Sequence, residues 1–401
     1  MIKNLQIALV HDWLLGVGGA EKTLKALHEI FPQAPIYTLF YDKKFTDWFM
    51  PQADIRPTFL QKVYNTLGSH KLLTPLMPIA IESVDLSDFD LVISSSVAFA
   101  KGLILKPQTR HICYCYSPTR QLWDWHAEYK KEGHFAPRTW VSLMQHLLRI
   151  WDRHASTRVD YFIAISENVH HRIRKYYNRD SVVIYPPVSQ LRLEIQNPKA
   201  INHGLEAKSY FLIVSRLYKH KNIDIAIKAF NKLEWPLVVM GDGPEFERLK
   251  KIAGPKVKMF GYQSDTIVHG LYTQCLAFIM PQEEDFGITP IEAMSYGKPV
   301  LALKRGGALE YIEEGINGEF FDDPTEEVLA DGVRRLKQNL PDYNVEFIKK
   351  TAEKFSADRF KKEVLDYLEK ELKIKSSPFF QQPNDYSHLN DHYQLPTDIL
   401  Y

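Results

Sequence analysis

Short apolar runs alternate with stretches of helical periodicity along most of this chain of 401 residues. Five strand-like runs lie in its second half, at residues 210–214, 236–240, 257–260, 275–280 and 299–303. Five more lie in its first half, at residues 5–10, 91–94, 111–114, 161–165 and 182–184. Strands that alternate with helices in this way form parallel sheets. The sequence therefore predicts an α/β fold with one parallel sheet in each half.

The two halves meet near the stiff dipeptide Pro186–Pro187, which is followed by a polar, linker-like stretch at residues 197–208. We predict an N-terminal domain over residues 1–190 and a C-terminal domain over residues 191–357. An amphipathic helix is expected at residues 355–372. The tail after it is rich in Gln, Asn, Asp, Pro and Tyr, a composition typical of a loosely packed or disordered segment.

The composition excludes several classes of protein. The formal net charge is +1, which argues against a nucleic-acid partner bound by bulk charge. No apolar stretch reaches the roughly 18 residues needed to span a membrane, and the first strand-like run is too short for a signal peptide. We therefore expect a cytoplasmic protein. The three cysteines, Cys113, Cys115 and Cys275, are expected to be buried thiols rather than a disulfide or a metal site.

Two glutamates, Glu284 and Glu292, bracket the loop and helix start that follow the fourth strand of the second half. Thr289 is a candidate helix cap, Pro290 suits a first helical turn, and Gly297 suits a helix end. Glu284 would then lie in the loop, and Glu292 about one turn into the helix. Open α/β sheets bind ligands at this edge, although acids in loops and first turns are also common without any function.

Arg216 and Lys221 follow the first strand of the second half, just before a helix whose cap would be Asn222. A diphosphate bound there would receive two fixed cations, each able to form a charge-assisted hydrogen bond worth about 1.5–3 kcal/mol. A solvated basic loop is the alternative interpretation. The position at a strand end favours the phosphate site.

A glycine-rich loop, Gly16 to Gly19, opens the first helix of the chain. Glycine lets a backbone approach a phosphate closely, and a helix start supplies free N–H groups. The loop lacks the glycine spacing and the acidic partner of a nicotinamide-binding motif, so we interpret it as an anion-approach loop. Asp88 and Asp90 precede a strand, which indicates turn residues. We predict no metal site and no cofactor.

Taken together, these motifs resemble family 4 of the retaining glycosyltransferases, which have two Rossmann-like domains facing each other across a cleft, the GT-B fold. The matching motifs appear in family order at residues 18–21, 215–222, 241–244, 284–294 and 306–310. Further motifs at residues 117–124 and 185–188 resemble the mannosyltransferase-like branch that builds lipopolysaccharide and exopolysaccharide. The resemblance implies that the C-terminal helix and tail, residues 358–401, pack back on the first domain.

The resemblance also implies roles in binding the donor, a nucleoside diphosphate sugar. Arg216 and Lys221 would hold its diphosphate, and Gly19 would approach the β-phosphate from the other domain. The reaction would transfer a hexose with retained anomeric configuration. Fixed cations would stabilise the charge that builds up on the leaving diphosphate, so no metal would be required.

The two carboxylates receive different roles from the same resemblance. Glu292 would accept hydrogen bonds from the ribose hydroxyls of the donor. Glu284 would engage the donor sugar, and it is counted with Arg216, Lys221 and Tyr116 as catalytic. The backbone near the donor would be that of three successive residues: Phe286, Gly287 and Ile288.

Two positions depart from this branch, because Tyr116 and Val97 stand where histidines are usual. Many relatives place a catalytic or sugar-orienting imidazole at the first position. Tyr116 can donate a hydrogen bond but does not titrate near pH 7, and we expect it to line the acceptor side of the cleft. Arg120 and Lys101 are the next candidates for the acceptor side.

The leading hypothesis is a metal-independent hexosyltransferase that uses UDP-glucose first and GDP-mannose second as the expected donor. Its acceptor would be a glycan or a lipid-linked sugar, and no nucleic acid is expected as a partner. A catalytically silent nucleotide-sugar-binding scaffold and a sugar-nucleotide epimerase are the alternatives. The departures at Tyr116 and Val97 motivate the scaffold, and the intact residues Arg216, Lys221 and Glu284 argue against it.

One of two amphipathic stripes leaves a membrane surface open as a partner. The first recurs at helical spacing over residues 59–67 beside Lys62 and Lys71, which is typical of a core-facing helix or of one that docks on lipid. A peripheral place on the inner face of the cell membrane is therefore possible for the protein. The second stripe is expected to pack in the core, and it comprises Trp140, Leu143, Met144, Leu147, Leu148 and Trp151.

Overall fold

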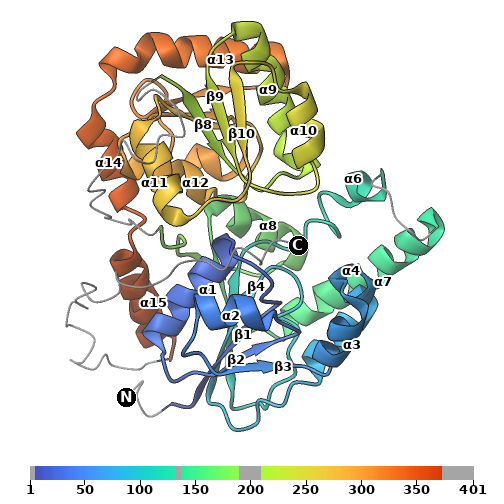
Figure 1. Cartoon of the computed structure of the whole chain (residues 1–401). Helices are drawn as coiled ribbons and strands as arrows, with labels where there is room; N and C mark the ends of the chain where they lie inside the picture. The colour runs from blue at the N-terminus through green and yellow to red at the C-terminus, as the bar shows by residue number, and fades with distance from the viewer. Residues whose placement is uncertain (1–4, 132–136, 189–208, 373–401) are drawn as a thin grey trace. The chain divides into compact units, whose positions relative to one another are not determined.

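The computed structural model describes residues 5–131, 137–188 and 209–372 (Figure 1). The chain divides into two compact units. Unit 1 contains the described chain up to Tyr185 and again from Phe360, and unit 2 runs from Pro186 to Arg359. Unit 1 is therefore built from two segments of chain that are far apart in sequence.

The described part of unit 1 contains a seven-stranded sheet in the order β3-β2-β1-β4-β5-β6-β7, and each pair of neighbours is parallel. The strands are β1 (Ile7–His11), β2 (Ile36–Thr38), β3 (Ile55–Pro57), β4 (Leu91–Ser96), β5 (Arg110–Cys115), β6 (Tyr161–Ala164) and β7 (Val182–Val183). The helices are α1 (Gly19–Ile30), α2 (Lys43–Phe49), α3 (Leu60–Leu67), α4 (His70–Leu73), α5 (Met77–Glu82), α6 (His126–Lys131), α7 (Arg138–Thr157) and α8 (Glu167–Tyr177). The strand order reverses between β1 and β4, which is where such sheets bind ligands.

The described part of unit 2 contains a six-stranded parallel sheet in the order β10-β9-β8-β11-β12-β13. Its strands are β8 (Phe211–Val214), β9 (Leu237–Met240), β10 (Val257–Phe260), β11 (Phe278–Met280), β12 (Val300–Leu303) and β13 (Gly318–Phe321). Its helices are α9 (Ile223–Leu233), α10 (Phe246–Ile252), α11 (Asp265–Gln274), α12 (Ile288–Ser295), α13 (Glu326–Asn339) and α14 (Val345–Glu353). Here the strand order reverses between β8 and β11, so the loops after these two strands meet at one edge.

The predicted α/β class is confirmed, and each strand predicted from an apolar run is present with ends shifted by up to three residues. Three further strands, β2, β3 and β13, were not predicted. The first two have three residues each, too few to show a period. β13 begins with Gly318, where a side chain would lie 2.2 Å from the carbonyl oxygen of Val300. Close approach of the backbones, rather than an apolar pattern, determines that position.

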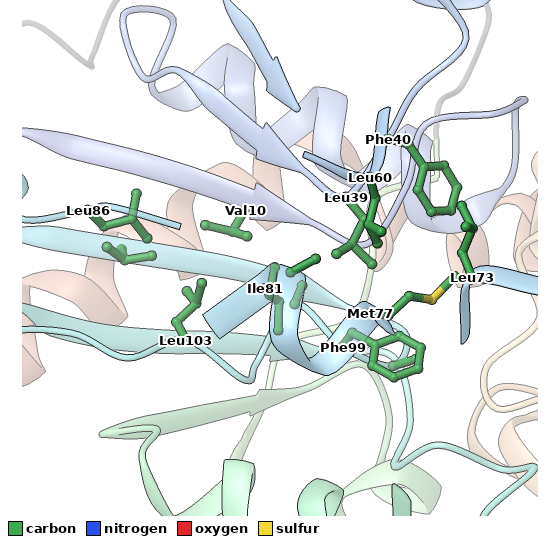
Figure 2. Close-up of a cluster of buried hydrophobic side chains, with 14 of the residues drawn as sticks. Val10, Leu39, Phe40, Leu60, Leu73, Met77, Ile81, Leu86, Phe99 and Leu103 are labelled. Carbon is green, nitrogen blue, oxygen red and sulfur yellow. The ribbon is translucent and has the colours of Figure 1, made fainter. Parts of the chain in front are cut away.

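The core of unit 1 joins the sheet to the short helices α3, α4 and α5 (Figure 2). Val10 comes from β1, while Leu60, Leu73, Met77 and Ile81 come from the helical segment, and all are almost completely buried. Burying each such side chain contributes about 1.5–3 kcal/mol. These side chains therefore fix the helical segment on the sheet.

The prediction that the stripe on α7 packs in the core is only partly right: Leu148 and Trp151 pack against the buried cluster, but other members of the stripe do not. Trp140, Leu143 and Leu147 are each about half exposed, at 52%, 47% and 48%. The side of α7 that is buried carries Val141 and the polar residues Gln145 and Asp152 instead. The polar residues are buried because their side chains form hydrogen bonds within unit 1. Periodicity identified an amphipathic helix, but the face that packs inward is not the one richest in large apolar residues.

Helix α15 (Ala357–Leu372) packs on unit 1, as the predicted C-terminal helix was expected to do. The ring of Phe360 lies edge-on to Tyr114 of β5, and Lys361 Nζ lies 3.6 Å from Glu29 Oε2 on α1. Phe360 is completely buried. The predicted linker at residues 197–208 and the tail beyond residue 372 lie outside the described residues.

Two smaller predictions have clear outcomes. All three cysteines are buried free thiols, as predicted. Thr289 was wrong as a helix cap, because α12 already begins at Ile288. Gly287 precedes it with a φ of +92°, a conformation that favours glycine. Among the described residues, no helix has the length and hydropathy needed to cross a bilayer.

Candidate functional site

The loop after β8 carries the two predicted cations in different environments. Arg216 is exposed, whereas Lys221 is buried at the end of a short 3-10 turn just before α9. Asn222 occupies the predicted capping position, but its side chain does not cap the helix. Its Nδ2 instead donates to the carbonyl oxygen of Pro281, 3.2 Å away. That hydrogen bond ties the loop after β8 to the loop after β11.

Lys221 and Glu284 form an ion pair where these two loops meet. Lys221 Nζ lies 2.6 Å from Glu284 Oε1, and Gln282 Nε2 donates to the same oxygen at 2.8 Å. Burial alone would raise the pKa of the Glu284 carboxyl. The charge and hydrogen bond of Lys221, the hydrogen bond of Gln282 and the charge of Arg216 outweigh burial and lower that pKa. Glu284 is therefore ionised at neutral pH.

Two glycines after β12 support the loop that carries Glu284. The backbone N–H of Gly307 donates to the carbonyl oxygen of Glu284 at 2.9 Å. A Cβ on Gly307 would lie 2.5 Å from Phe286 Cα, and one on Gly306 would lie 2.3 Å from the Glu284 carbonyl oxygen. Both contacts are with backbone, which cannot move aside easily. These glycines therefore allow the loop after β12 to touch the backbone of the loop after β11, which carries Glu284.

Phe286 anchors the same loop through its side chain. The ring is 2% exposed and packs edge-on against Tyr311 and Phe355. A Cβ on Gly287 would lie 2.8 Å from the Tyr311 hydroxyl oxygen. That hydroxyl is buried and has no hydrogen-bond partner within the described structure. With this side chain anchored, the backbone of Phe286, Gly287 and Ile288 leads into the start of α12. The N–H groups at a helix start favour an anion.

Glu292 lies one turn into α12, as predicted, and a buried tyrosine orients it. The Tyr272 hydroxyl donates to Glu292 Oε2 at 3.0 Å. The Tyr272 ring stacks on Tyr296, whose hydroxyl contacts His269 Nδ1. Burial, followed by the charge of Glu292, raises the pKa of Tyr272, so its hydroxyl remains a donor. Tyr272 therefore fixes one carboxylate oxygen.

In unit 1, the predicted glycine loop opens α1 at Gly19, and Tyr116 lies directly behind it. The Tyr116 hydroxyl donates to the carbonyl oxygen of Ala20 at 2.9 Å and lies 2.9 Å from Ser95 Oγ. Ser95 in turn contacts Nδ1 of His11. Tyr116 is 9% exposed. Its hydroxyl is thus engaged by protein groups, and its contact holds the first turn of α1.

Tyr116→Phe is expected to lower the stability of the protein by about 0.5–1.5 kcal/mol, the usual net contribution of one hydrogen bond. The phenyl ring preserves the packing, so the change removes only the contacts that the hydroxyl makes with Ala20 and Ser95. Urea unfolding followed by circular dichroism measures the change. Tyr37→Phe is a suitable control, because the Tyr37 hydroxyl bonds only the exposed side chain of Arg56 among its described contacts. A loss of stability no larger than that of the control would remove the positioning role.

Asp12 holds the loop after β4 through four backbone amides. Its carboxylate accepts hydrogen bonds from the N–H groups of residues 97–100, among them Val97 at 2.6 Å and Ala100 at 2.9 Å. No sequence motif indicated this contact, because the partners lie more than 80 residues away along the chain. The hydrogen bond from the backbone N–H of Val97 to Asp12 thus holds this residue in place, independently of its side chain.

The two reserve candidates for the acceptor side have protein partners. Lys101 is 1% exposed, and its Nζ lies 2.6 Å from Asp152 Oδ1. Arg120 is 9% exposed, pairs with Asp124 at 3.1 Å and stacks on the ring of Trp125. Lys101 is therefore a core residue, whereas Arg120 lies in a charged cluster.

The structure thus brings Lys221, Glu284 and the start of α12 together in unit 2, with Arg216 on the same loop as Lys221. Gly19 and Tyr116 form a separate cluster in unit 1. Within the described ranges, no group of three or more His, Cys, Asp and Glu side chains could hold a metal ion. Asp90, one of the two predicted turn residues, accepts a hydrogen bond from the backbone N–H of Gln6.

Known proteins resemble this chain in both sequence and fold. Residues 195–354 match the family described as "Glycosyl transferases group 1". The alpha-1,3/1,6-mannosyltransferase ALG2 of Candida glabrata is 25% identical over 77% of this chain and 78% of its own length. The lipopolysaccharide 1,6-galactosyltransferase of Salmonella typhimurium is 27% identical over 63% of this chain and 72% of its own.

A solved structure of Anabaena Alr3699/HepE in complex with UDP-glucose matches 91% of this chain and 99% of its own, with a TM-score of 0.63 and 18% identity. The two Rossmann-like sheets and this likeness define the fold as GT-B, as predicted. The match to the group 1 glycosyltransferases lies within the second unit, which belongs to that family. The protein is therefore placed among the glycosyltransferases.

Proposed function

We propose that this glycosyltransferase moves a hexose, with retention of configuration, from a nucleoside diphosphate sugar bound by unit 2. The observation that carries the proposal is the ion pair of the buried Lys221 and the partly exposed Glu284 beside the start of α12. A cation, a carboxylate and a helix N-terminus at the switch point of a parallel sheet suit a sugar diphosphate. Arg216, exposed on the same loop, supplies a second cation.

The chemistry assigned to these residues is electrostatic. As the bond between the sugar and the diphosphate breaks, negative charge builds up on the diphosphate and positive charge on the sugar. Lys221 and Arg216 stabilise the first charge, together with the N–H groups at the start of α12. Glu284 stabilises the second. Glu292, oriented by Tyr272, binds the ribose hydroxyls.

Unit 1 contributes the start of α1 to this proposal. Gly19 offers a backbone N–H without a side chain, and it is exposed at the first position of the helix. An N–H at such a position favours an anion such as a phosphate. Tyr116 acts as a positioning residue that fixes this turn through the carbonyl oxygen of Ala20.

UDP-glucose is the first donor to test and GDP-mannose the second. UDP-glucose is supported by the solved relative that binds it, and GDP-mannose by the mannosyltransferase relative. The acceptor in the proposal is a glycan or a lipid-linked sugar at the cytoplasmic side of a membrane. The galactosyltransferase relative, named for lipopolysaccharide, supports an acceptor of this kind.

Incubation with donor alone tests the class of reaction. Slow hydrolysis of UDP-glucose to UDP and glucose, measured by chromatography, supports a transferase. Formation of an epimeric sugar nucleotide would instead indicate an epimerase, and binding without any turnover would indicate a scaffold. The same assay in excess EDTA is expected to retain its rate, because two cations and a helix start replace a metal in the proposal. Loss of the rate in EDTA and its return with Mg²⁺ or Mn²⁺ would contradict that part.

Glu292→Gln and Glu284→Gln are expected to affect different kinetic constants. Glu292→Gln should raise the donor KM more than it lowers kcat, because ribose contacts bind the ground and transition states equally. Glu284→Gln should mainly lower kcat, because its contact strengthens as charge develops on the sugar. Tyr272→Phe is expected to raise the donor KM as Glu292→Gln does, by a smaller factor. Steady-state kinetics with varied donor would show the reverse pattern if the two carboxylates were assigned to the wrong groups.

A further inference from the structure

Nine of the eighteen exposed large apolar side chains of the described structure lie on two segments of unit 1. We refer to these nine as the apolar face: Phe59, Leu67, Leu72, Leu76, Ile79, Trp140, Leu143, Leu147 and Ile150. Single exposed apolar residues are common on any protein, but a cluster on one region marks an interaction surface. The clustering therefore marks this region as an interaction surface.

The two segments are neighbours because they share one core. Leu148 and Trp151 on the inner side of α7 pack against the buried cluster. Met77 and Ile81 belong to that cluster (Figure 2). Trp151 Nε1 also donates to Glu82 at the end of α5, at 2.8 Å. The helices α3, α4 and α7 accordingly lie together in unit 1 (Figure 1). Their exposed rows therefore belong to adjoining surfaces.

Each segment presents its apolar residues on one side. On α7 the exposed residues recur at positions 140, 143, 147 and 150, a spacing that places them on a single helical face. Leu72, Leu76 and Ile79 recur with the same spacing along the segment from α4 to α5. An interfacial helix has this pattern of one apolar face on an otherwise polar surface.

Charge within the two segments that carry the apolar face has one sign. No Asp or Glu occurs at residues 55–81 or 138–151. Lys62, Lys71 and Arg138 are exposed within these ranges. A negatively charged surface is therefore the complementary partner.

A groove of about 500 Å³ adjoins the same row on α7. His146, Arg149, Ile150, Arg153 and His154 line it. Arg153 Nη1 is buried there without a hydrogen-bond partner in the described structure. The accessible lining of the groove is mostly apolar, and Arg149 Nε already donates to the carbonyl oxygen of Leu122, so the groove extends the apolar row.

We propose that the apolar face docks unit 1 on the surface of an anionic lipid bilayer. The apolar side chains enter the boundary of the acyl chains, and the lysines and arginines lie at the level of the headgroups. A second copy of this chain is a poorer partner, because a symmetric dimer would bring two basic surfaces together. The proposal extends the membrane-linked acceptor of the proposed function. Vesicle binding needs neither donor nor transfer, so the two proposals can fail separately.

Co-sedimentation of the full chain with vesicles tests the proposal. We expect binding to vesicles of phosphatidylglycerol and phosphatidylcholine, with weak binding to phosphatidylcholine alone. The triple variant Leu143→Ser, Leu147→Ser, Ile150→Ser should lower the partition coefficient by roughly tenfold or more. The triple variant Lys62→Glu, Lys71→Glu, Arg138→Glu should lower it by roughly fivefold or more per residue, since each basic residue near such a surface contributes about 1 kcal/mol.

Matched controls use side chains outside the apolar face. Ile104→Ser, Ile316→Ser, Phe347→Ser removes three comparably exposed apolar residues, and Lys251→Glu, Lys256→Glu, Lys354→Glu reverses three exposed charges. Both controls should bind vesicles as the unaltered protein does. Melting temperature and UDP binding should be unchanged in all four variants. Equal losses in variants and controls, equal binding to neutral and anionic vesicles, or concentration-dependent dimers that disappear with the first variant would overturn the proposal.

Discussion

Lys221→Met is expected to lower kcat/KM for the donor by roughly a hundredfold, since a charge-assisted hydrogen bond to the diphosphate contributes about 1.5–3 kcal/mol and every 1.4 kcal/mol is a factor of ten. Free UDP should also bind more weakly, because in the proposed mechanism the cation contacts the leaving group as well as the substrate. Isothermal titration with UDP and steady-state kinetics with UDP-glucose measure the two losses. Arg216→Ala should weaken both in the same direction.

Lys219→Met is the matched control for this variant. It removes a lysine two positions away in the same 3-10 turn, but Lys219 is exposed, whereas Lys221 is buried against Glu284. We expect the control to change UDP affinity by less than about threefold, as for a surface charge. Unchanged UDP affinity in both Lys221→Met and Arg216→Ala would show that the diphosphate binds elsewhere.

Lys221→Met is also expected to change how the rate depends on pH. In the unaltered protein, Lys221 lowers the pKa of Glu284 from its ordinary value of 4.5. The stabilisation from this carboxylate is therefore present above the ordinary pKa and is lost as the pH falls through the lowered value. Without Lys221, burial dominates and the pKa rises. The acidic limb of the rate profile should then move to higher pH in Lys221→Met and stay in place in Lys219→Met.

The largest expected effect on stability comes from the buried ion pair of Lys101 and Asp152. Lys101→Met should lower the free energy of unfolding by about 3–5 kcal/mol, because it leaves an uncompensated charge in the core. Both side chains are 1% exposed. Asp152 also accepts hydrogen bonds from Thr119, Trp123 and Tyr177, so the loop after β5 depends on its position. Denaturant unfolding of the full chain measures the change.

Lys43→Met is the control for Lys101→Met. Lys43 pairs with Asp47 at 2.9 Å, but the two side chains are 76% and 63% exposed. An exposed pair contributes at most about 1 kcal/mol, so this variant should unfold almost as the unaltered protein does. If Lys101→Met and Lys43→Met lowered the free energy of unfolding equally, the buried pair would contribute no more to stability than the exposed one.

The sequence predicted the fold class and the placement of the cations, because both follow from local patterns. Apolar runs gave the strands, and Arg216 and Lys221 were located by their position after one of them. The pairing of Lys221 with Glu284 was not predictable, since the residues are 63 positions apart and meet only through the strand order. The need for Gly307 was hidden for the same reason, because it arises from contact with the backbone of Phe286.

For other side chains, the sequence predicted the position along the fold but not the residues that they contact. The motif around Tyr116 placed it correctly after β5, yet nothing in the motif indicated that its hydroxyl would bond to Ala20. The stripe on α7 showed a period without showing which side packs inward. Both outcomes depend on contacts between segments far apart in the chain, which periodicity does not record.

Helix α15 packs on unit 1 although it follows unit 2 in the chain. Synthesis of unit 2 is therefore finished before synthesis of unit 1. A ribosome completes every described strand of unit 2 before it makes Phe360, Val364 and Leu368, which are almost fully buried in the finished protein. Domains generally fold as units during synthesis. Unit 2 can therefore fold on the ribosome, whereas unit 1 must wait with an uncovered apolar surface. A chain that stops before Phe360 would leave unit 1, rather than unit 2, dependent on chaperones.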